Sequence, residues 1–330
     1  MSAYSSIGST NYIPCRVRRS NPLKEAKRGY VTIATGKTHY YRIAKNLLDS
    51  YRVNASGAFP FAIICDRENE YTAAFDKVVL MNNPAHSYMD KLRLFDCLPW
   101  DETIFIDADC LCYGDIDRWW ELFAQNGSDF SVFGRAYEDL DTDKGWFQTA
   151  GMGEFREQIH FVPSFSGGVY YLRNTATCKK VFDTAKYAAA HYRDYPFAIF
   201  SDPADEPVIA LGMAVANCRP TACSDVGLYT YRRFTHADIL APQAEWQYQE
   251  AWRPILLIHW GNFGTMKAFY LFECAKLHRK AQDKPLSGPG WFLLYRCRLL
   301  YTGLHVCDVI TLGKRVRRRI KKRICTSANR

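Results

Sequence analysis

The chain has 330 residues, of which 48% are hydrophobic, and a formal net charge of +9. This composition is typical of a globular protein with a substantial core, arranged as one large α/β domain or two smaller ones. Residues 314–323 hold eight basic side chains and no acidic one, which leaves only +1 for the rest of the chain. The positive charge is therefore concentrated near the C-terminus, and the rest of the chain is nearly neutral.

The twelve cysteines are scattered and form no Cys-x-x-Cys pair. We expect neither a disulfide nor a zinc site from Cys110 and Cys112, which one residue separates. Residues 1–14 contain no long apolar run, so neither a signal peptide nor a membrane anchor is expected there. These features favour reduced thiols in a cytoplasmic protein.

The first half of the chain predicts strands that alternate with helices. Residues 1–29 are polar and mixed and are predicted to be a poorly packed lead-in. Helical spacing of apolar residues follows over 39–51, and a second helix is predicted over 88–98, with Pro99 just past its end. The apolar runs that predict strands are YVTIAT (30–35), FPFAIICD (59–66), KVVLM (77–81) and TIFIDAD (103–109).

This alternation indicates an α/β fold with a mainly parallel sheet that is covered on both faces. The second half is less regular, and no internal repeat is present. Its predicted elements are extended segments at 128–134 and 160–172, helices at 175–192 and 206–217, a buried strand at 254–260 and a helix near 266–281.

The string TIFIDAD places two carboxylates, Asp107 and Asp109, directly after a buried strand. Ligands of open α/β sheets bind at the carboxyl edge of the strands. Paired carboxylate oxygens suit Mg²⁺ or Mn²⁺, which in turn can bridge a diphosphate. The alternative interpretation is a loop with two solvated acids.

A second Asp-x-Asp, Asp141 and Asp143, has no apolar strand before it. Its neighbours in EDLDTDKG are typical of a turn, so we predict an ordinary surface loop there.

The surroundings of the first pair resemble a known family. The stretch KLRLFDCLPWDETIFIDADCLCYGDIDRWW (91–120) resembles the glycosyltransferases of family 8, which include glycogenin-like and bacterial lipopolysaccharide galactosyl- and glucosyltransferases. The matching features are Lys91, the strand ending in Asp107 and Asp109, Leu111 and the Asp115-Ile116 turn. The resemblance extends more loosely over residues 30–281. It implies a GT-A-type fold with a nucleotide-binding N-terminal half.

The resemblance assigns further residues to the donor. The junction after the first strand holds base and ribose in the family, which points to Thr35, Gly36 and Tyr40; an ordinary strand-to-helix turn is the alternative. Ala108, between the two acids, is also placed among the donor-binding residues. The segment FSGGVYYL (165–172) resembles the family's Asn-Ser-Gly-Val strand beside donor and acceptor but lacks its Asn.

The string Ile258-His259-Trp260-Gly261 resembles the family's His-aromatic-x-Gly-x-x-Lys motif. In that motif His completes the metal shell and Lys binds diphosphate, which points to His259, Gly264 and Lys267. The spacing between His259 and the last two is two residues longer than in the family. A neutral imidazole at the end of a buried strand suits Mn²⁺.

The resemblance also implies that Asp205 and Glu206, at the start of a predicted helix, reach the donor sugar. Acids at a helix start are favoured by the macrodipole alone, so a structural role is the alternative. Lys91 and Lys267 would stabilise the leaving nucleoside diphosphate together with Mn²⁺ or Mg²⁺. The family further implies a UDP-sugar donor and retention of anomeric configuration.

We therefore divide the chain into a lead-in (1–29), a glycosyltransferase domain (30–287) and a C-terminal segment (288–330). Within the domain, 30–120 would be the nucleotide-binding half and 121–287 the acceptor-side half, with a glycan or glycolipid as acceptor. In the C-terminal segment, Leu312, Val316, Ile320 and Ile324 form an apolar stripe at helical spacing inside the basic cluster.

That pattern is typical of a helix lying on an anionic membrane surface, which we favour over nucleic-acid binding. A haloacid-dehalogenase-type phosphohydrolase also ends a strand in Asp-x-Asp. Its motif, however, has Thr or Val where this chain has Leu111, and it lies on the first strand rather than after three others. A non-catalytic module that binds sugar nucleotides is the other alternative.

Overall fold

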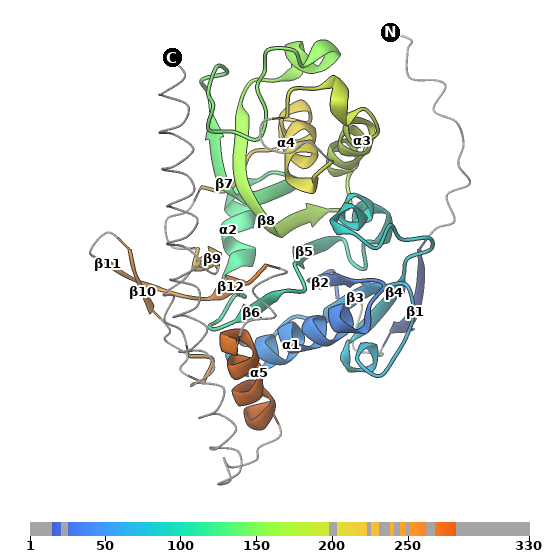
Figure 1. The fold of residues 1–330 in the computed structure, drawn as a ribbon, viewed down its shortest axis with the longest axis vertical. Helices are drawn as coiled ribbons and strands as arrows, with labels where there is room; N and C mark the ends of the chain where they lie inside the picture. The colour runs from blue at the N-terminus through green and yellow to red at the C-terminus, as the bar shows by residue number, and fades with distance from the viewer. Residues whose placement is uncertain are drawn as a thin grey trace, which may run out of the picture.

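The structure of the chain, a computed structural model, describes residues 15–20, 26–197, 203–222, 226–230, 238–240, 245–248, 251–261 and 268–281. Its centre is a seven-stranded sheet with the order β1-β4-β3-β2-β5-β8-β7 (Figure 1). The strands are β1 (Arg16–Ser20), β2 (Arg28–Ala34), β3 (Phe61–Cys65), β4 (Lys77–Leu80), β5 (Glu102–Ile106), β7 (Phe130–Tyr137) and β8 (Val162–Arg173).

The four middle strands, β4, β3, β2 and β5, run parallel, whereas β1, β8 and β7 join antiparallel. The parallel strands are almost wholly apolar because both of their faces are buried. From β2 the chain proceeds to β3 and β4 on one side, then crosses to β5 on the other side of β2. The direction of winding reverses between β2 and β5, and ligands of open α/β sheets bind outside the carboxyl ends of the strands at such a point.

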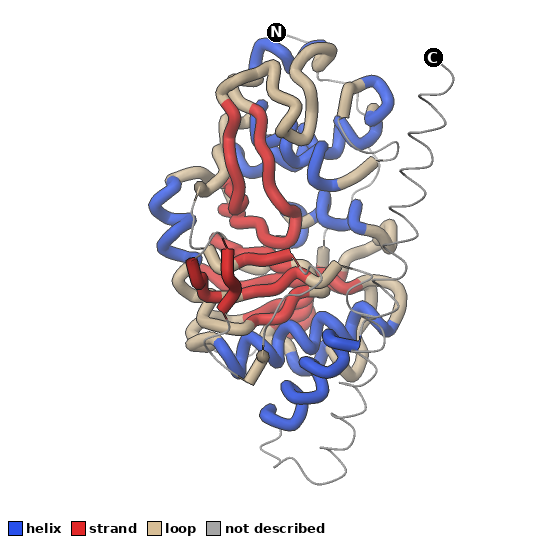
Figure 2. Tube along the Cα trace, turned by 60° about the vertical axis from the view of Figure 1, so that its left-hand side comes forward, coloured by secondary structure: helices blue, strands red, loops and turns tan. Residues whose placement is uncertain are grey.

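Helices cover both faces of the sheet (Figures 1 and 2). On one face, Tyr41, Leu47 and other buried residues of α1 pack with Trp119 and Phe123 of α2 in one apolar cluster. On the other face, α3 and α4 pack on the opposite side chains of the same strands. The helices are α1 (Thr38–Asn54), α2 (Trp119–Asn126), α3 (Ala176–Ala190), α4 (Asp205–Val215) and α5 (Ala268–Ala281). The α/β architecture with a doubly covered sheet is thus confirmed.

A second, small sheet lies beside the carboxyl end of β5 and has the order β6-β12-β9. Its central strand β12 (Leu257–His259) runs antiparallel to β6 (Cys110–Cys112) and parallel to β9 (Leu228–Thr230). Strands β10 (Glu245–Tyr248) and β11 (Ala251–Pro254) form a separate hairpin. Helix α2 and strands β6, β9 and β10 were not predicted from the sequence pattern; all are short elements, the longest being the eight residues of α2.

The lead-in 1–29 is more ordered than predicted. Its residues 16–20 form β1, which pairs with β4 at the edge of the sheet. Cys15, immediately before β1, forms a disulfide with Cys97, so the expectation of reduced thiols is wrong for this pair. The two cysteines are 82 residues apart in sequence, and the fold brings their Cα atoms within 5.4 Å of each other. The other cysteines within the described part of the chain are free and buried.

The helix predicted over 88–98 is instead two 3₁₀ turns, η2 (Tyr88–Arg93) and η3 (Phe95–Cys97). The buried carboxylate of Asp90 in η2 accepts hydrogen bonds from Thr35 Oγ1 (2.8 Å) and the Ala85 amide (2.6 Å). These tertiary bonds hold the segment in short turns. Further 3₁₀ turns are η1 (Thr72–Ala74), η4 (Gly153–Gln158) and η5 (Tyr192–Asp194).

Among the helices in the described ranges, none combines the length and the apolar character that crossing a bilayer requires. The basic amphipathic segment predicted within 288–330 lies outside the described residues.

Candidate metal centre and adjoining cavity

Asp107 and Asp109 lie in the turn between the large and the small sheet. Strand β5 ends at Ile106, and β6 begins at Cys110. The Asp107 amide donates to the Gly168 carbonyl on β8 (2.9 Å), and the Cys110 amide donates to the Asp107 carbonyl (3.1 Å). This tight turn fixes both carboxylates at the carboxyl edge of the parallel strands, as the sequence predicted.

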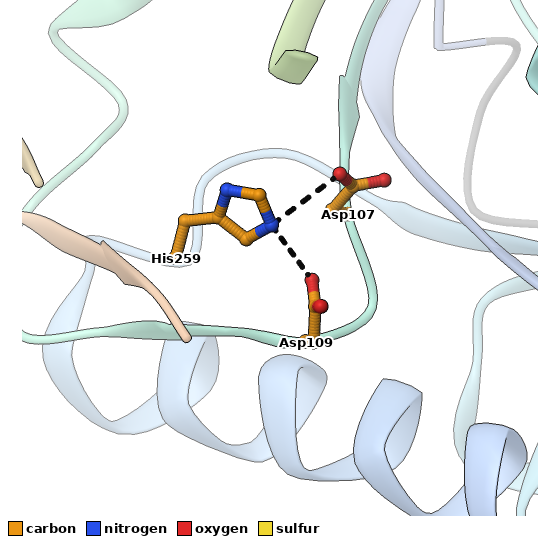
Figure 3. A group of neighbouring side chains, drawn as sticks. All are labelled: Asp107, Asp109 and His259. Carbon is orange, nitrogen blue, oxygen red and sulfur yellow. Dashed lines mark ion pairs between the residues drawn. The ribbon is translucent and has the colours of Figure 1, made fainter. Parts of the chain in front are cut away.

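His259 reaches the same edge from the other end of the chain. It is the last residue of β12, where it pairs with Cys110 of β6. The next residue, Trp260, donates its amide hydrogen to the Asp109 carbonyl (2.9 Å). The imidazole Nε2 lies 3.1 Å from Asp109 Oδ1 and 3.6 Å from Asp107 Oδ2 (Figure 3). Pairing of β12 with β6 is therefore what brings the histidine to the two acids.

These three side chains form a set that suits a divalent cation. One ligand atom from each of them lies within 4.8 Å of the others. Two carboxylate oxygens and one imidazole nitrogen are donors that Mn²⁺ accepts, and Mg²⁺ takes the oxygens readily. His259 Nδ1 has no hydrogen-bond partner among the residues that the structure describes. Within the described residues, Nε2 is therefore the only ring nitrogen of His259 with polar partners, and these partners are the two acids.

Lys91 connects Asp107 to helix α4. Its ammonium group donates to Asp107 Oδ2 (2.9 Å), Asp205 Oδ2 (2.8 Å) and the Gly167 carbonyl (3.2 Å). An ammonium group has three protons, so these three acceptors satisfy it. The sequence assigned Lys91 to the donor diphosphate; in the structure its ammonium is directed at the acids.

The charges of the centre shift one another's pKa values. Burial raises the pKa of Asp107 to about 6, although Lys91 opposes the shift. Burial also acts to raise the pKa of Asp109, but its hydrogen bond with His259 holds that pKa below the ordinary value. For Lys91, burial favours the neutral form, yet Asp107 and Asp205 raise its pKa well above the ordinary value. The pKa values of the two acids therefore shift in opposite directions, and Asp109, the acid bonded to His259, stays ionised to lower pH than Asp107 does.

Asp205 and Glu206 stand in the first turn of α4 and differ in their surroundings. Asp205 is buried and accepts hydrogen bonds from Lys91 and from the Tyr170 hydroxyl (3.1 Å). Glu206 accepts one from the Gly167 amide (3.3 Å), and burial together with the charge of Asp205 raises its pKa. Asp205 is thus paired with a cation, whereas Glu206 accepts a hydrogen bond from a backbone amide.

A cavity of about 350 Å³ opens between the carboxyl ends of β2 and β5, at the reversal of winding. This volume lies at the small end of the range for ligand pockets. Gly36 does not line it directly; its Cα faces the His86 ring, which does. The sequence-predicted residues that line the cavity are Thr35, Tyr40, Lys91, Asp107, Ala108 and Asp109.

Two predicted residues, Gly264 and Lys267, lie outside the described residues. Sequence reasoning missed Asp90, which anchors Thr35, and Tyr170, which holds Asp205. Asp90 directly precedes Lys91, and Tyr170 lies in the FSGGVYYL segment, so both adjoin residues that the sequence did single out.

No protein-family model and no curated protein matches the chain. Among solved structures, the galactosyltransferase LgtC in complex with donor and acceptor sugar analogues is similar, with a TM-score of 0.48, 11% identity, and coverage of 81% of this chain and 99% of that one. The bifunctional glycosyltransferase WbbM has a TM-score of 0.47 and 13% identity, covering 84% of this chain and 52% of that one. Mouse xyloside xylosyltransferase 1 has a TM-score of 0.43 and 11% identity, covering 72% and 99% respectively.

Proposed function

We propose that the chain is a divalent-metal-dependent glycosyltransferase that moves a sugar from a nucleotide-sugar donor to a glycan or glycolipid acceptor. The observation that carries this proposal is the convergence of Asp107, Asp109 and His259 beside the cavity at the switch point of the sheet. Carboxylates that can hold a cation beside a cavity suit transfer from a diphosphate donor. A cation bound there would neutralise the charge that develops on the departing nucleoside diphosphate.

The donor would enter the cavity with its nucleoside at the β2 end and its diphosphate at Asp107 and Asp109. Thr35, Tyr40 and Ala108 supply walls of mixed polarity there, and Gly36 leaves room for the His86 ring that lines the cavity. The family resemblance favours UDP as the nucleotide and retention at the anomeric carbon. It also assigns Gly264 and Lys267 to the diphosphate.

Helix α4 would present one of its two acids, Glu206, to the donor sugar. Asp205 is neutralised by Lys91 and held by Tyr170, so it serves to keep Lys91 and Asp107 in place. Within the described residues, Glu206 accepts one hydrogen bond, from the Gly167 amide, which leaves carboxylate acceptor positions for a sugar hydroxyl. Burial and the charge of Asp205 raise the pKa of Glu206, so this carboxyl holds a proton more readily than an ordinary Glu does.

A screen of nucleotide sugars with Mn²⁺ tests the function directly. We expect transfer or slow hydrolysis of at least one UDP-sugar, released nucleoside diphosphate being measured, and loss of the signal in EDTA. Metal-dependent phosphate release from a generic phosphomonoester without sugar transfer would favour a phosphohydrolase. Tight UDP-sugar binding by calorimetry without turnover would favour a non-catalytic binding module.

We further propose that residues 288–330 hold the enzyme on an anionic membrane surface, where a glycolipid acceptor would be found. The basis is the basic cluster at 314–323 with its apolar stripe. Full-length protein should co-sediment with vesicles that contain phosphatidylserine, and replacing the eight basic residues by Gln should abolish this. Equal binding of both proteins to vesicles, or preferential binding of the wild type to RNA, would contradict it.

A further inference from the structure

Two adjacent glycines of β8, Gly167 and Gly168, lie between the proposed metal ligands and the acids of α4. The Gly168 carbonyl accepts the Asp107 amide (2.9 Å), and the Gly167 carbonyl accepts the Lys91 ammonium (3.2 Å). The Gly167 amide donates to Glu206 Oε1 (3.3 Å). This dipeptide therefore joins the metal-binding acids on the β5 side to the acids of α4.

The absence of a side chain at Gly168 makes room for the metal-binding histidine. A Cβ atom at Gly168 would lie 3.0 Å from His259 Nδ1 and 3.3 Å from its Cγ. These separations are shorter than ordinary carbon–nitrogen and carbon–carbon contacts, so the ring would have to move. Because His259 Nδ1 has no hydrogen-bond partner within the described residues, packing against Gly168 is what orients this side of the ring.

The absence of a side chain at Gly167 makes room for the acids of α4. A Cβ atom there would lie 2.9 Å from Glu206 Cγ and 2.9 Å from the Tyr170 hydroxyl. That hydroxyl donates to Asp205 (3.1 Å). A methyl group at Gly167 would therefore displace Glu206 and Tyr170, on the side of the strand away from the histidine.

The two glycines lie at an irregularity of β8. The register between β7 and β8 shifts between Val132 and Gly134, opposite residues 166–169, and Gly167 and Gly168 face different neighbours there. Neither glycine is among the described residues with positive φ. An alanine at either position therefore adds volume without forcing an unfavourable backbone conformation.

We propose that Gly167 and Gly168 are positioning residues with separate tasks. Gly168 sets the orientation of His259 toward Asp107 and Asp109, and hence the affinity for the divalent cation. Gly167 seats Glu206 and Tyr170 for catalysis, a role that rests on the proposed glycosyl transfer. Each glycine acts because it has no Cβ atom: Gly168 leaves room for His259, and Gly167 leaves room for Glu206 and Tyr170.

Mn²⁺ binding to the full-length protein, measured by electron paramagnetic resonance of free Mn²⁺ without any nucleotide, separates the two roles. We expect Gly168→Ala to weaken Mn²⁺ binding about 10-fold or more, the effect typical of disturbing a group that orients a metal ligand. Gly167→Ala should weaken Mn²⁺ binding less than Gly168→Ala does, because it leaves His259 untouched and reaches Asp107 only through Tyr170, Asp205 and Lys91. Equal Mn²⁺ affinity of the two variants would overturn the assignment.

A double variant guards against a general effect on folding. Once His259→Ala has removed the ring, adding Gly168→Ala should weaken Mn²⁺ binding no further, because coupled residues are non-additive. Recovery of folding in Gly168→Ala/His259→Ala, should Gly168→Ala alone not fold, would likewise assign the clash to the ring. A further loss of Mn²⁺ affinity in the double variant, or failure of both to fold, would refute the role of Gly168.

For Gly167→Ala we expect kcat for transfer to fall about 100-fold at saturating Mn²⁺, since small displacements of reacting groups have effects of this size. An unchanged kcat would refute its role. The Mn²⁺ measurements need no sugar donor. A protein that transfers no sugar at all would therefore count against the proposed function, while the inference about Gly168 would still be tested by Mn²⁺ binding.

Discussion

Two stretches of the chain contain Asp-x-Asp, and they lie in opposite surroundings. Asp107 and Asp109 follow a buried strand and keep only 14% and 15% of their side chains exposed. Asp141 and Asp143 lie in an exposed turn between β7 and β8. Within the described part of the chain, the first pair meets a histidine in a metal-binding arrangement and the second pair does not.

The comparison shows what the short motif leaves undetermined. The two pairs have the same spacing but differ in burial and in the presence of a third donor. At Asp107 and Asp109 a strand from the far end of the domain brings that donor, His259, because β12 pairs with β6. At Asp141 and Asp143 each carboxylate remains solvated, and solvated acids bind cations weakly.

The largest expected effect is a direct test of this contrast. Asp107→Asn or Asp109→Asn should lower transfer about 1000-fold or more, because each removes a charged ligand from the cation that neutralises the leaving group. Release of nucleoside diphosphate measures the rate. The matched control Asp141→Asn/Asp143→Asn should stay within about twofold of wild type. Comparable losses in both pairs would erase the distinction.

Glu206 of α4 tests a carboxylate that is not one of the three proposed metal ligands. Glu206→Gln should lower kcat about 100-fold, as expected for removal of a general acid–base or charge-stabilising group. Mn²⁺ affinity should stay unchanged, because Glu206 does not touch the three metal-binding side chains. The exposed Glu157→Gln is the control. If kcat of Glu206→Gln equals that of wild type, the acid is a helix-start residue only.

Removing the third donor should make the buried acid pair behave more like the exposed one. We expect His259→Ala to need about 10- to 100-fold more Mn²⁺ for half-maximal transfer, with the rate partly restored at high Mn²⁺. A titration of rate against Mn²⁺ measures this, and the exposed His160→Ala is the control. An unchanged titration would return His259 to a purely structural role.

The last test concerns a buried acid away from the metal centre. Glu273 in α5 is fully buried, accepts the Ile239 amide (2.7 Å) and lies 2.6 Å from Lys276 Nζ. Burial raises its pKa to about 7, despite the opposing charge of Lys276. The folded state therefore holds this proton more tightly than the unfolded state does.

The resulting stabilisation is full below the unfolded pKa of about 4.3 and is lost as pH rises through about 7. It amounts to on the order of 3 kcal/mol between those limits. Glu273→Gln cannot titrate, so its Tm should fall less between pH 5 and pH 8 than that of wild type. Parallel Tm profiles of the two proteins by circular dichroism would show that Glu273 does not titrate in this window.

Local sequence patterns were sufficient to predict most of the large sheet and the helices that cover it. The strands β2, β3, β4 and β5 and the helices α1, α3, α4 and α5 were predicted from apolar runs and helical spacing, because each buries a face or stripe whose period shows in the sequence. The carboxylates at the end of β5 were predicted for the same reason, since a buried apolar run that stops at charged residues marks a sheet edge. Elements of three or four residues, such as β6 and β9, contain too few residues to show a period.

The sequence by itself thus determined the parallel core, its helical cover and the position of Asp107 and Asp109, because these depend on contacts close along the chain. Only the tertiary structure decided which distant groups join them. Lys91 is bonded to Asp107 and Asp205, Cys15 to Cys97, and the glycines of β8 contact both His259 and Glu206. Each of these contacts spans tens of residues, and they form because strand pairing and crossover place the ends of separate elements at one edge. No periodicity along the chain carries that information.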